Sequence, residues 1–212
     1  NTAPLPETVL TGGTLGGLLG FRSGSLDAAQ NALGRIALGL ATNFNDQHRL
    51  GQDLAGALGG NFFAAPTPQV LYPNNPVNGG NAVIGAAVAN ASALTTSDYK
   101  LTANGGGNYT LMRLSDNTTL FSAAPLPQTV DGLTISMNSG AANAGDTFLI
   151  QPTRAAAGSF GVALADARNI AAAAPIRSSA SLANTGTAAI SPGSVDLPPP
   201  PNANLQDTVT IT

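Results

Sequence analysis

Residues 14–50 read TLGGLLGFRSGSLDAAQNALGRIALGLATNFNDQHRL, and this stretch decides the fold class. Within it, leucines recur every seven residues, and a strict seven-residue repeat keeps one side of an α-helix turned toward one partner. The stretch therefore predicts a single helix of a helical rod, on the order of 50 Å long at 1.5 Å per residue. We expect a packing seam along this helix, formed by Leu19, Leu26, Leu33, Ile36, Leu40 and Phe44.

Both ends of the expected helix carry terminal signals. Thr14 is a suitable N-cap, and Gly51 is a suitable stop after a last turn that contains His48, where the helix dipole favours a cation. The glycines between residues 16 and 39 oppose the helix, each by roughly 1 kcal/mol relative to alanine. Those at 16, 20 and 24 either admit a second helix closely or merely weaken a frayed start, and the sequence leaves both interpretations open.

After residue 51, short alternating runs bounded by turn residues replace the seven-residue period, as is typical of β-strands. The sequence Asn104-Gly-Gly-Gly-Asn108 between two runs indicates a β-hairpin. A short helical turn is expected at 166–174 and a polyproline spacer at 198–201. Strands are expected at 69–72, 82–88, 99–103, 109–114, 118–121, 133–137, 146–151, 159–165, 187–191 and 208–212.

These patterns predict an α+β chain in which one long helix of a helical rod is followed by small antiparallel β domains, sandwich- or barrel-like. We expect four regions: a partial helical rod segment at 1–60, a loop-rich connection with a short strand at 61–81, a compact β module at 82–152, and a further β region with a short helix, truncated at its end, at 153–212. The turns at 104–108 and 138–145 should be exposed tips, open to antibodies and proteases. Both chain ends look cut, which suggests a fragment of a longer protein.

The composition excludes several classes of partner. Hydrophobic residues make up 43% of the chain and charged residues only 9%, against about 25% in an ordinary soluble domain. Lys+Arg is 8 and Asp+Glu is 11, so the net charge is -3 and no cation cluster is available for nucleic acid or an anionic membrane. Because Cys is 0, disulfides, thiol chemistry and cysteine-ligated metals are excluded. No apolar run is long enough for a transmembrane helix, and no signal peptide opens the chain.

A search for catalytic and metal-binding patterns is negative. A Ser–His–Asp arrangement would need the single histidine, His48, which is better explained by its position in the last helical turn. Zinc, EF-hand and phosphate-loop patterns are absent. The acids Asp98, Asp116, Asp131 and Asp146 lie beside turns or strand starts, where we expect them to bond local backbone. We therefore expect no catalytic, cofactor or metal residues and no enzymatic activity.

Several stretches, in their order along the chain, resemble the family of the bacterial flagellar hook-associated protein 1, the hook–filament junction protein. Those of the helical part are GGTLGGLLGFRS at 12–23 and LGLATNFNDQH at 38–48. Those of the β part are ASALTTSDY at 91–99, VDGL at 130–133 and GDTFLIQP at 145–152. Each motif is modest alone, but the ordered set is specific.

The resemblance implies a structural component of the flagellum, extracellular and without enzymatic activity, that forms the junction between hook and filament by axial packing. The implied partners are the flagellar hook protein, the second hook–filament junction protein and copies of the chain itself. It also implies export through the flagellar secretion apparatus without a cleaved signal peptide, and a central fragment without the family's terminal helices, which we expect to be a monomer. The alternative is a surface adhesin or binding module of β domains. A helix longer than its own domain needs favours the structural interpretation.

Overall fold

A computed structural model of the chain describes residues 12–72 and 78–174, with scattered positions between 176 and 191. The strands predicted at 187–191 and 208–212 and the spacer at 198–201 lie wholly or mostly outside the described residues. The described residues fold into two compact units, the first formed by 12–39 with 66–160 and the second by 40–65 with those after 160. The four predicted region boundaries stay predictions.

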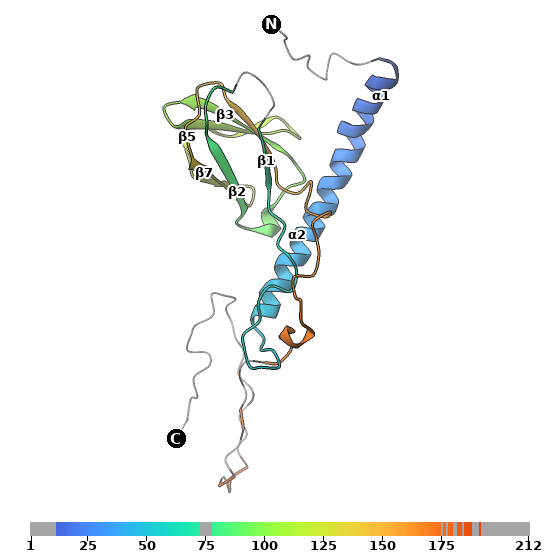
Figure 1. The fold of residues 1–212 in the computed structure, drawn as a ribbon, viewed down its shortest axis with the longest axis vertical. Coiled ribbons are helices and arrows are strands. Elements are labelled where there is room, and N and C mark those ends of the chain that lie inside the picture. Colours follow the sequence, from blue (N-terminus) through green and yellow to red (C-terminus); the bar gives the residue numbers. More distant parts are fainter. Residues whose placement is uncertain are drawn as a thin grey trace. The chain divides into compact units, whose positions relative to one another are not determined.

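One long helical element runs from Gly13 to Arg49 and confirms the predicted helix (Figure 1). It consists of α1 (Gly13–Phe21), a π-helical turn (Arg22–Leu26) and α2 (Asp27–Arg49). Thr14 as N-cap is wrong, because the helix already begins at Gly13 and Gly12 takes the N-cap position without a side-chain bond. The wider π turn follows Leu19 and ends at Leu26, so the angle between these two seam residues departs from that of a regular α-helix.

The first unit contains a sandwich of two antiparallel sheets, and neither sheet closes into a barrel within the described residues. The strand orders are β1-β8-β3-β4-β5 in the larger sheet and β2-β7-β6 in the smaller. The strands are β1 (Gln69–Leu71), β2 (Val83–Val88), β3 (Tyr99–Gly105), β4 (Asn108–Arg113), β5 (Thr118–Pro125), β6 (Gln128–Val130), β7 (Leu133–Ser139) and β8 (Thr147–Gln151). The sandwich form of the fold prediction is thus confirmed.

Every run predicted between 69 and 151 contains a strand, although β6 was not predicted. The predicted hairpin is also confirmed, since Gly105 pairs with Asn108. The loop residues Gly106 and Gly107 have φ angles of 63° and 80°, as a two-residue type I′ turn requires.

The prediction of a strand at 159–165 is wrong. In this stretch the only bridge is an isolated one between Val162 and Phe63. The following helical turn is shorter than predicted, a 3-10 helix (Ala167–Asn169) whose first turn is capped by the Asp166 side chain.

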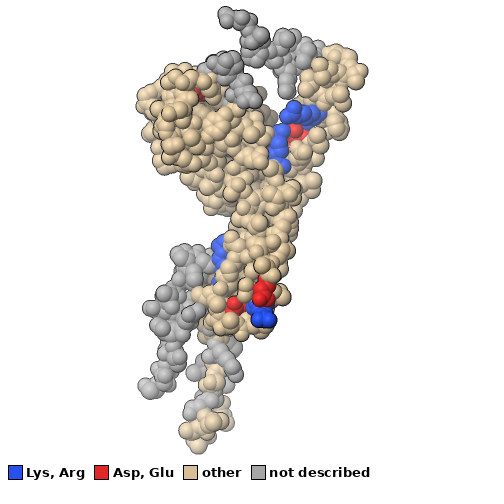
Figure 2. All heavy atoms as spheres, in the orientation of Figure 1, with Lys and Arg blue, Asp and Glu red and all other residues tan. Residues whose placement is uncertain are grey.

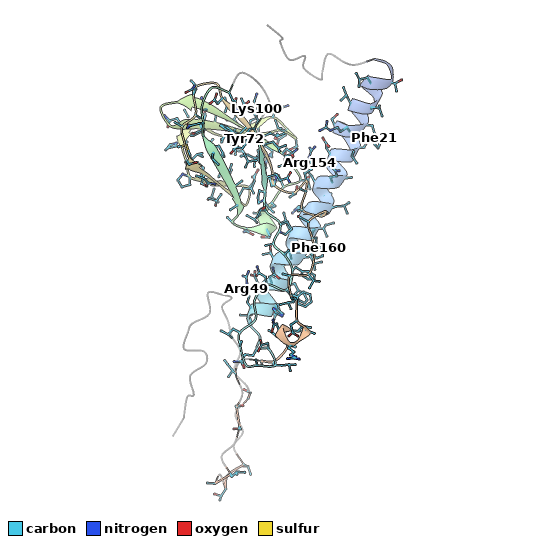
Figure 3. The ribbon with its side chains drawn as sticks, in the orientation of Figure 1. Phe21, Arg49, Tyr72, Lys100, Arg154 and Phe160 are labelled. Carbon is cyan, nitrogen blue, oxygen red and sulfur yellow. The ribbon has the colours of Figure 1, made fainter. Side chains whose placement is uncertain are left out.

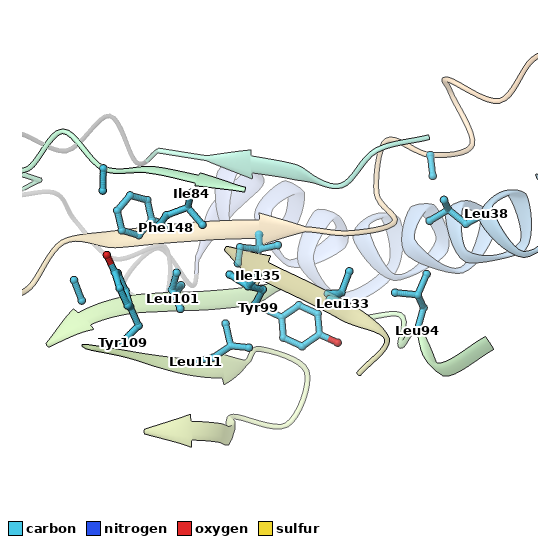
Figure 4. Close-up of a cluster of buried hydrophobic side chains, with 14 residues drawn as sticks. Leu38, Ile84, Leu94, Tyr99, Leu101, Tyr109, Leu111, Leu133, Ile135 and Phe148 are labelled. Atoms are coloured by element: carbon cyan, nitrogen blue, oxygen red, sulfur yellow. The ribbon is translucent and has the colours of Figure 1, made fainter. Parts of the chain in front are cut away.

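The core of the first unit follows from the period-two alternation of its strands. In β3 the alternation places Tyr99, Leu101 and Ala103 inside and leaves Lys100 exposed. Leu111 and Ile150 from the larger sheet and Ile84, Leu133 and Ile135 from the smaller join the same buried cluster (Figure 4). Leu38 of α2 also belongs to this cluster, so the part of the helix up to Gly39 packs with the sandwich in the first unit.

Candidate functional site

The long helix has an exposed apolar face. The predicted seam residues of this face, Leu26, Leu33, Ile36, Leu40 and Phe44, are 42%, 59%, 67%, 50% and 42% exposed, and Leu19 is half-buried. At 3.6 residues per turn, the five exposed residues lie within roughly 80° of one another around the helix. In α1 no residue is buried, and Leu15, Leu18 and Phe21 are exposed as well. We call the five residues Leu26, Leu33, Ile36, Leu40 and Phe44 the apolar face, whose packing role stays a prediction.

A second face of α2 is buried, and sequence analysis missed it. Its residues alternate by three and four positions, and all are buried: Asn31, Gly34, Leu38, Ala41, Asn45 and His48. This inner face is centred roughly 130° around the helix from the apolar face. The helix therefore uses a mostly polar and small face for contacts within the chain and leaves its most apolar face exposed.

In the first unit, the inner face packs against the segment that follows β8. A Cβ atom added to Gly34 would lie only 1.7 Å from the Thr153 carbonyl oxygen, so this glycine permits a direct backbone contact. The Thr153 hydroxyl donates to the Asn31 side-chain oxygen at 3.0 Å. Gly34 thus has a packing role, although the sequence identified it only as a poor helix former.

An ionic cluster lies beside this contact. Arg154 donates to Asp27 of α2 at 2.7 Å and also to Asp98, and Figure 3 shows Arg154 next to the helix. Gln151 donates to the same Asp98 carboxylate at 3.2 Å, and Asn31 does so at 3.4 Å. The expectation that Asp98 bonds local backbone is wrong, because this buried carboxylate collects donors from α2 and from the end of β8.

The other three predicted turn acids behave differently from one another. Asp116 does bond local backbone, accepting from the Thr118 N–H at 3.1 Å, and its hydrogen bond from Arg113 holds the pKa of the carboxyl below its usual range. Asp131 instead accepts from Arg113 at 2.9 Å and from the Tyr99 hydroxyl at 3.0 Å, so the local expectation fails there.

Asp146 connects two loops of the first unit. Its carboxylate is buried and accepts backbone N–H groups of Gly79, Gly80 and Asn143 at 2.8–3.0 Å. Desolvation opposes ionisation, but the three hydrogen bonds outweigh it and lower the pKa of Asp146. The predicted bond to local backbone is present only with Asn143, because Gly79 and Gly80 lie more than 60 positions away in the sequence.

In the second unit, the inner face binds two extended segments. The Asn45 side chain accepts the N–H groups of Phe62 and Phe63, both at 2.9 Å, and donates to the Phe63 carbonyl at 3.0 Å. His48 donates from Nδ1 to the Gly60 carbonyl at 2.8 Å and accepts the Ala171 N–H at Nε2 at 2.9 Å. This pair of partners requires a neutral imidazole, not the cation that the helix dipole led us to expect.

The surface around the helix carries little charge. Figure 2 shows that most of the visible surface is uncharged, with basic and acidic groups in a few places along the helix. Within the described ranges, no three His, Cys, Asp or Glu side chains gather as a metal site requires. None of the described helices has an apolar stretch long enough to cross a bilayer. The feature best suited to function is therefore the exposed apolar face.

Two family models match the chain. "Flagellar hook-associated protein FlgK helical domain" matches residues 1–63. "Flagellar hook-associated protein 1, D2-like domain" matches residues 73–152. The first match includes the long helix, and the second includes most strands of the sandwich.

Two bacterial relatives are similar to most of the chain. Flagellar hook-associated protein 1 of Escherichia coli (strain K12) is 38% identical over 172 residues, 80% of this chain and 30% of that protein. The protein of the same name from Salmonella typhimurium is 37% identical over 150 residues, 70% of this chain and 27% of that protein. The chain thus spans less than a third of the length of these curated relatives.

A solved structure has the same fold. The flagellar hook junction protein FlgK from Burkholderia pseudomallei matches with a TM-score of 0.77 and 41% identity, over 90% of this chain and 35% of that one.

Proposed function

Because this chain belongs to the family of flagellar hook-associated protein 1, we propose that it serves as a structural part of the bacterial flagellum at the junction between hook and filament. The observation that carries the proposal is the apolar face of the long helix, which remains exposed although the same helix has a well-packed inner face. A protein with no further contacts to make would gain stability by turning its leucines inward.

The apolar face supports axial packing of subunits. Burying a leucine, isoleucine or phenylalanine side chain completely contributes about 1.5–3 kcal/mol, so five such residues in one row favour a partner surface. Its length along α2 and its lack of charge suit another helix better than a small ligand. In the intact protein, the proposed partners are the flagellar hook protein, the second hook–filament junction protein and copies of the same chain.

The proposal also assigns a location and a route. The protein works outside the cell as part of the flagellum, is exported through the flagellar secretion apparatus without a cleaved signal peptide, and has no enzymatic activity. A cysteine-free sequence suits a protein that passes through two redox environments.

The test replaces two residues of the apolar face by polar ones. Leu33→Asn with Ile36→Asn, introduced into the gene that encodes this chain in a motile host, should abolish swimming and leave hooks without filaments in electron micrographs. Arg35→Asn is the matched control, because Arg35 is exposed on the same helix but points away from both faces. Arg35→Asn should swim like the parent, and circular dichroism should show the same helix content in both variants.

Normal filaments in the double variant would show that the apolar face is not an assembly contact. If that variant instead swims normally but loses attachment to surfaces, the adhesin alternative replaces the structural one.

A further inference from the structure

A segment near residue 171 is held by hydrogen bonds to the last turn of α2 and to the residues that follow it. Gln52 and Ala173 exchange two backbone bonds, at 2.8 and 3.1 Å, and the Leu54 N–H donates to the Arg168 carbonyl at 3.2 Å. Ala171 lies between these bonds and is buried. Its own N–H donates to a side chain, the Nε2 atom of His48, at 2.9 Å.

His48 can make this bond in one protonation state only. Nδ1 must carry a hydrogen, because it faces the Gly60 carbonyl at 2.8 Å, and Nε2 must be free to accept. In the imidazolium form both ring nitrogens carry hydrogens, so Nε2–H would face the Ala171 N–H and neither donor would have an acceptor.

The segment around Ala171 packs closely against the residues near His48. A Cβ atom added to Gly51 would lie 2.1 Å from the Ala171 carbonyl oxygen, and one added to Gly59 would lie 2.6 Å from the Ala171 Cβ. The Phe62 ring lies against the imidazole, with centroids 5.5 Å apart and the rings edge to face. The two glycines therefore let the backbone lie directly against Ala171, next to the imidazole.

The charged groups on the elements packed around His48 do not hydrogen-bond its ring. On α2, Asp46 and Arg49 pair with each other at 3.2 Å. Asp53, in the turn after the helix, accepts the N–H groups of Ala55 and Ala57. The remaining charged residues near Ala171 are Asp166 and Arg168, and the Asp166 carboxylate accepts the backbone N–H of Arg168. A proton on His48 would thus gain no hydrogen-bonded carboxylate.

We propose that His48 is a proton-sensitive latch: the neutral ring fastens the segment around Ala171 to the end of α2, and protonation releases it. The sign follows from the geometry. The latch closes on the neutral ring, so it is closed at the higher pH and opens when the pH falls far enough to protonate the ring. His48 is the single histidine of the sequence, so no other imidazole contributes.

Amide hydrogen exchange on the 212-residue chain tests the latch. After correction for the intrinsic pH dependence of exchange, the protection of the Ala171 amide should fall at least tenfold between pH 8 and pH 5. The Asn81 amide, which donates to the Ala141 carbonyl in the first unit, is the internal reference and should keep its protection. In His48→Gln, whose amide can both donate and accept without titrating, the protection of Ala171 should not change with pH.

Ring nitrogen NMR on the unmodified chain gives a second measurement that does not depend on the variant. At pH 8, Nδ1 should carry the hydrogen, and the midpoint of ring protonation should coincide with the loss of Ala171 protection. Constant protection of Ala171, a hydrogen on Nε2 at pH 8, or the same pH dependence in a folded His48→Gln would each overturn the proposal.

Discussion

Gly34 and Gly39 lie on the same helix but have opposite surroundings. A Cβ at Gly34 would clash with the Thr153 carbonyl, whereas one at Gly39 meets nothing within 4 Å. Gly39→Ala should therefore stabilise the chain by up to about 1 kcal/mol through helix propensity. Gly34→Ala should destabilise it by about 1–3 kcal/mol, because the overpacked contact outweighs the same propensity gain.

Urea unfolding, monitored by circular dichroism, gives the apparent unfolding midpoint of each of the two variants, which is compared with that of the parent. A stabilising Gly34→Ala would mean that α2 does not pack closely on Thr153. A destabilising Gly39→Ala would mean that this side of the helix is covered.

The ionisation of the Tyr99 hydroxyl makes the stability of the sandwich depend on pH. Burial raises the pKa of Tyr99 to about 12; the Thr95 hydrogen bond lowers it and the Asp131 carboxylate raises it. In the unfolded chain a tyrosine pKa is about 10, so the folded state binds this proton more tightly. Tyr99 therefore contributes stability that is fully present below about pH 10 and is lost as the pH rises through about 12.

An ultraviolet titration of tyrosinate should show this late ionisation step, coincident with alkaline unfolding. Because burial also raises the pKa of Tyr109, Tyr99→Phe should make the late step smaller without removing it. Complete ionisation of every tyrosine near pH 10 in a chain that is still folded would contradict the assigned role of Tyr99.

Among the secondary-structure elements, the long helix contains more than one seven-residue repeat, and only the leucine repeat was visible to sequence analysis. Asn31, Leu38 and Asn45 are also seven residues apart, and they belong to the buried inner face. Hydrophobic periodicity overlooks this row because two of its three members are polar. Asn31 bonds a side chain, and Asn45 bonds the backbone of Phe62 and Phe63, so polar groups are what these positions require. The existence of the helix could be predicted, but which side it buries could not.

Among the strands, too, the sequence predicted those that face an apolar core and failed elsewhere. Alternation predicted each run from 69 to 151, because each of these strands has one side in an apolar core. The run at 159–165 has a similar composition, but Val162 is 61% exposed and pairs only through one bridge. Long-range polar contacts also could not be predicted, because nothing in the sequence near Asp98 indicates that Arg154, 56 positions away, would bind it.

For the whole molecule, the exposed apolar residues raise the question of self-association. Burying a large apolar side chain completely contributes about 1.5–3 kcal/mol, and each Å² of buried apolar surface contributes about 25 cal/mol. A fully exposed side chain of this kind therefore has about 100 Å² of apolar surface to bury, and a half-exposed one has about 50 Å². Two copies that pair through the five residues of the apolar face would thus remove only about 500 Å² of apolar surface. A stable interface needs about 1,000 Å² or more of total buried surface, about twice what these side chains supply.

The residues of α1 do not readily extend that pairing. The π turn at Arg22–Leu26 interrupts the regular spacing, so one straight partner helix cannot follow both the α1 residues and the apolar face. The net charge of -3 adds a weak repulsion between copies. We therefore expect the 212-residue chain to be a monomer at micromolar concentration, with assembly depending on additional contacts in the flagellum. Sedimentation equilibrium checks this expectation. A dominant dimer that Leu33→Asn with Ile36→Asn disrupts, and Arg35→Asn does not, would show instead that the apolar face alone is sufficient to join two copies.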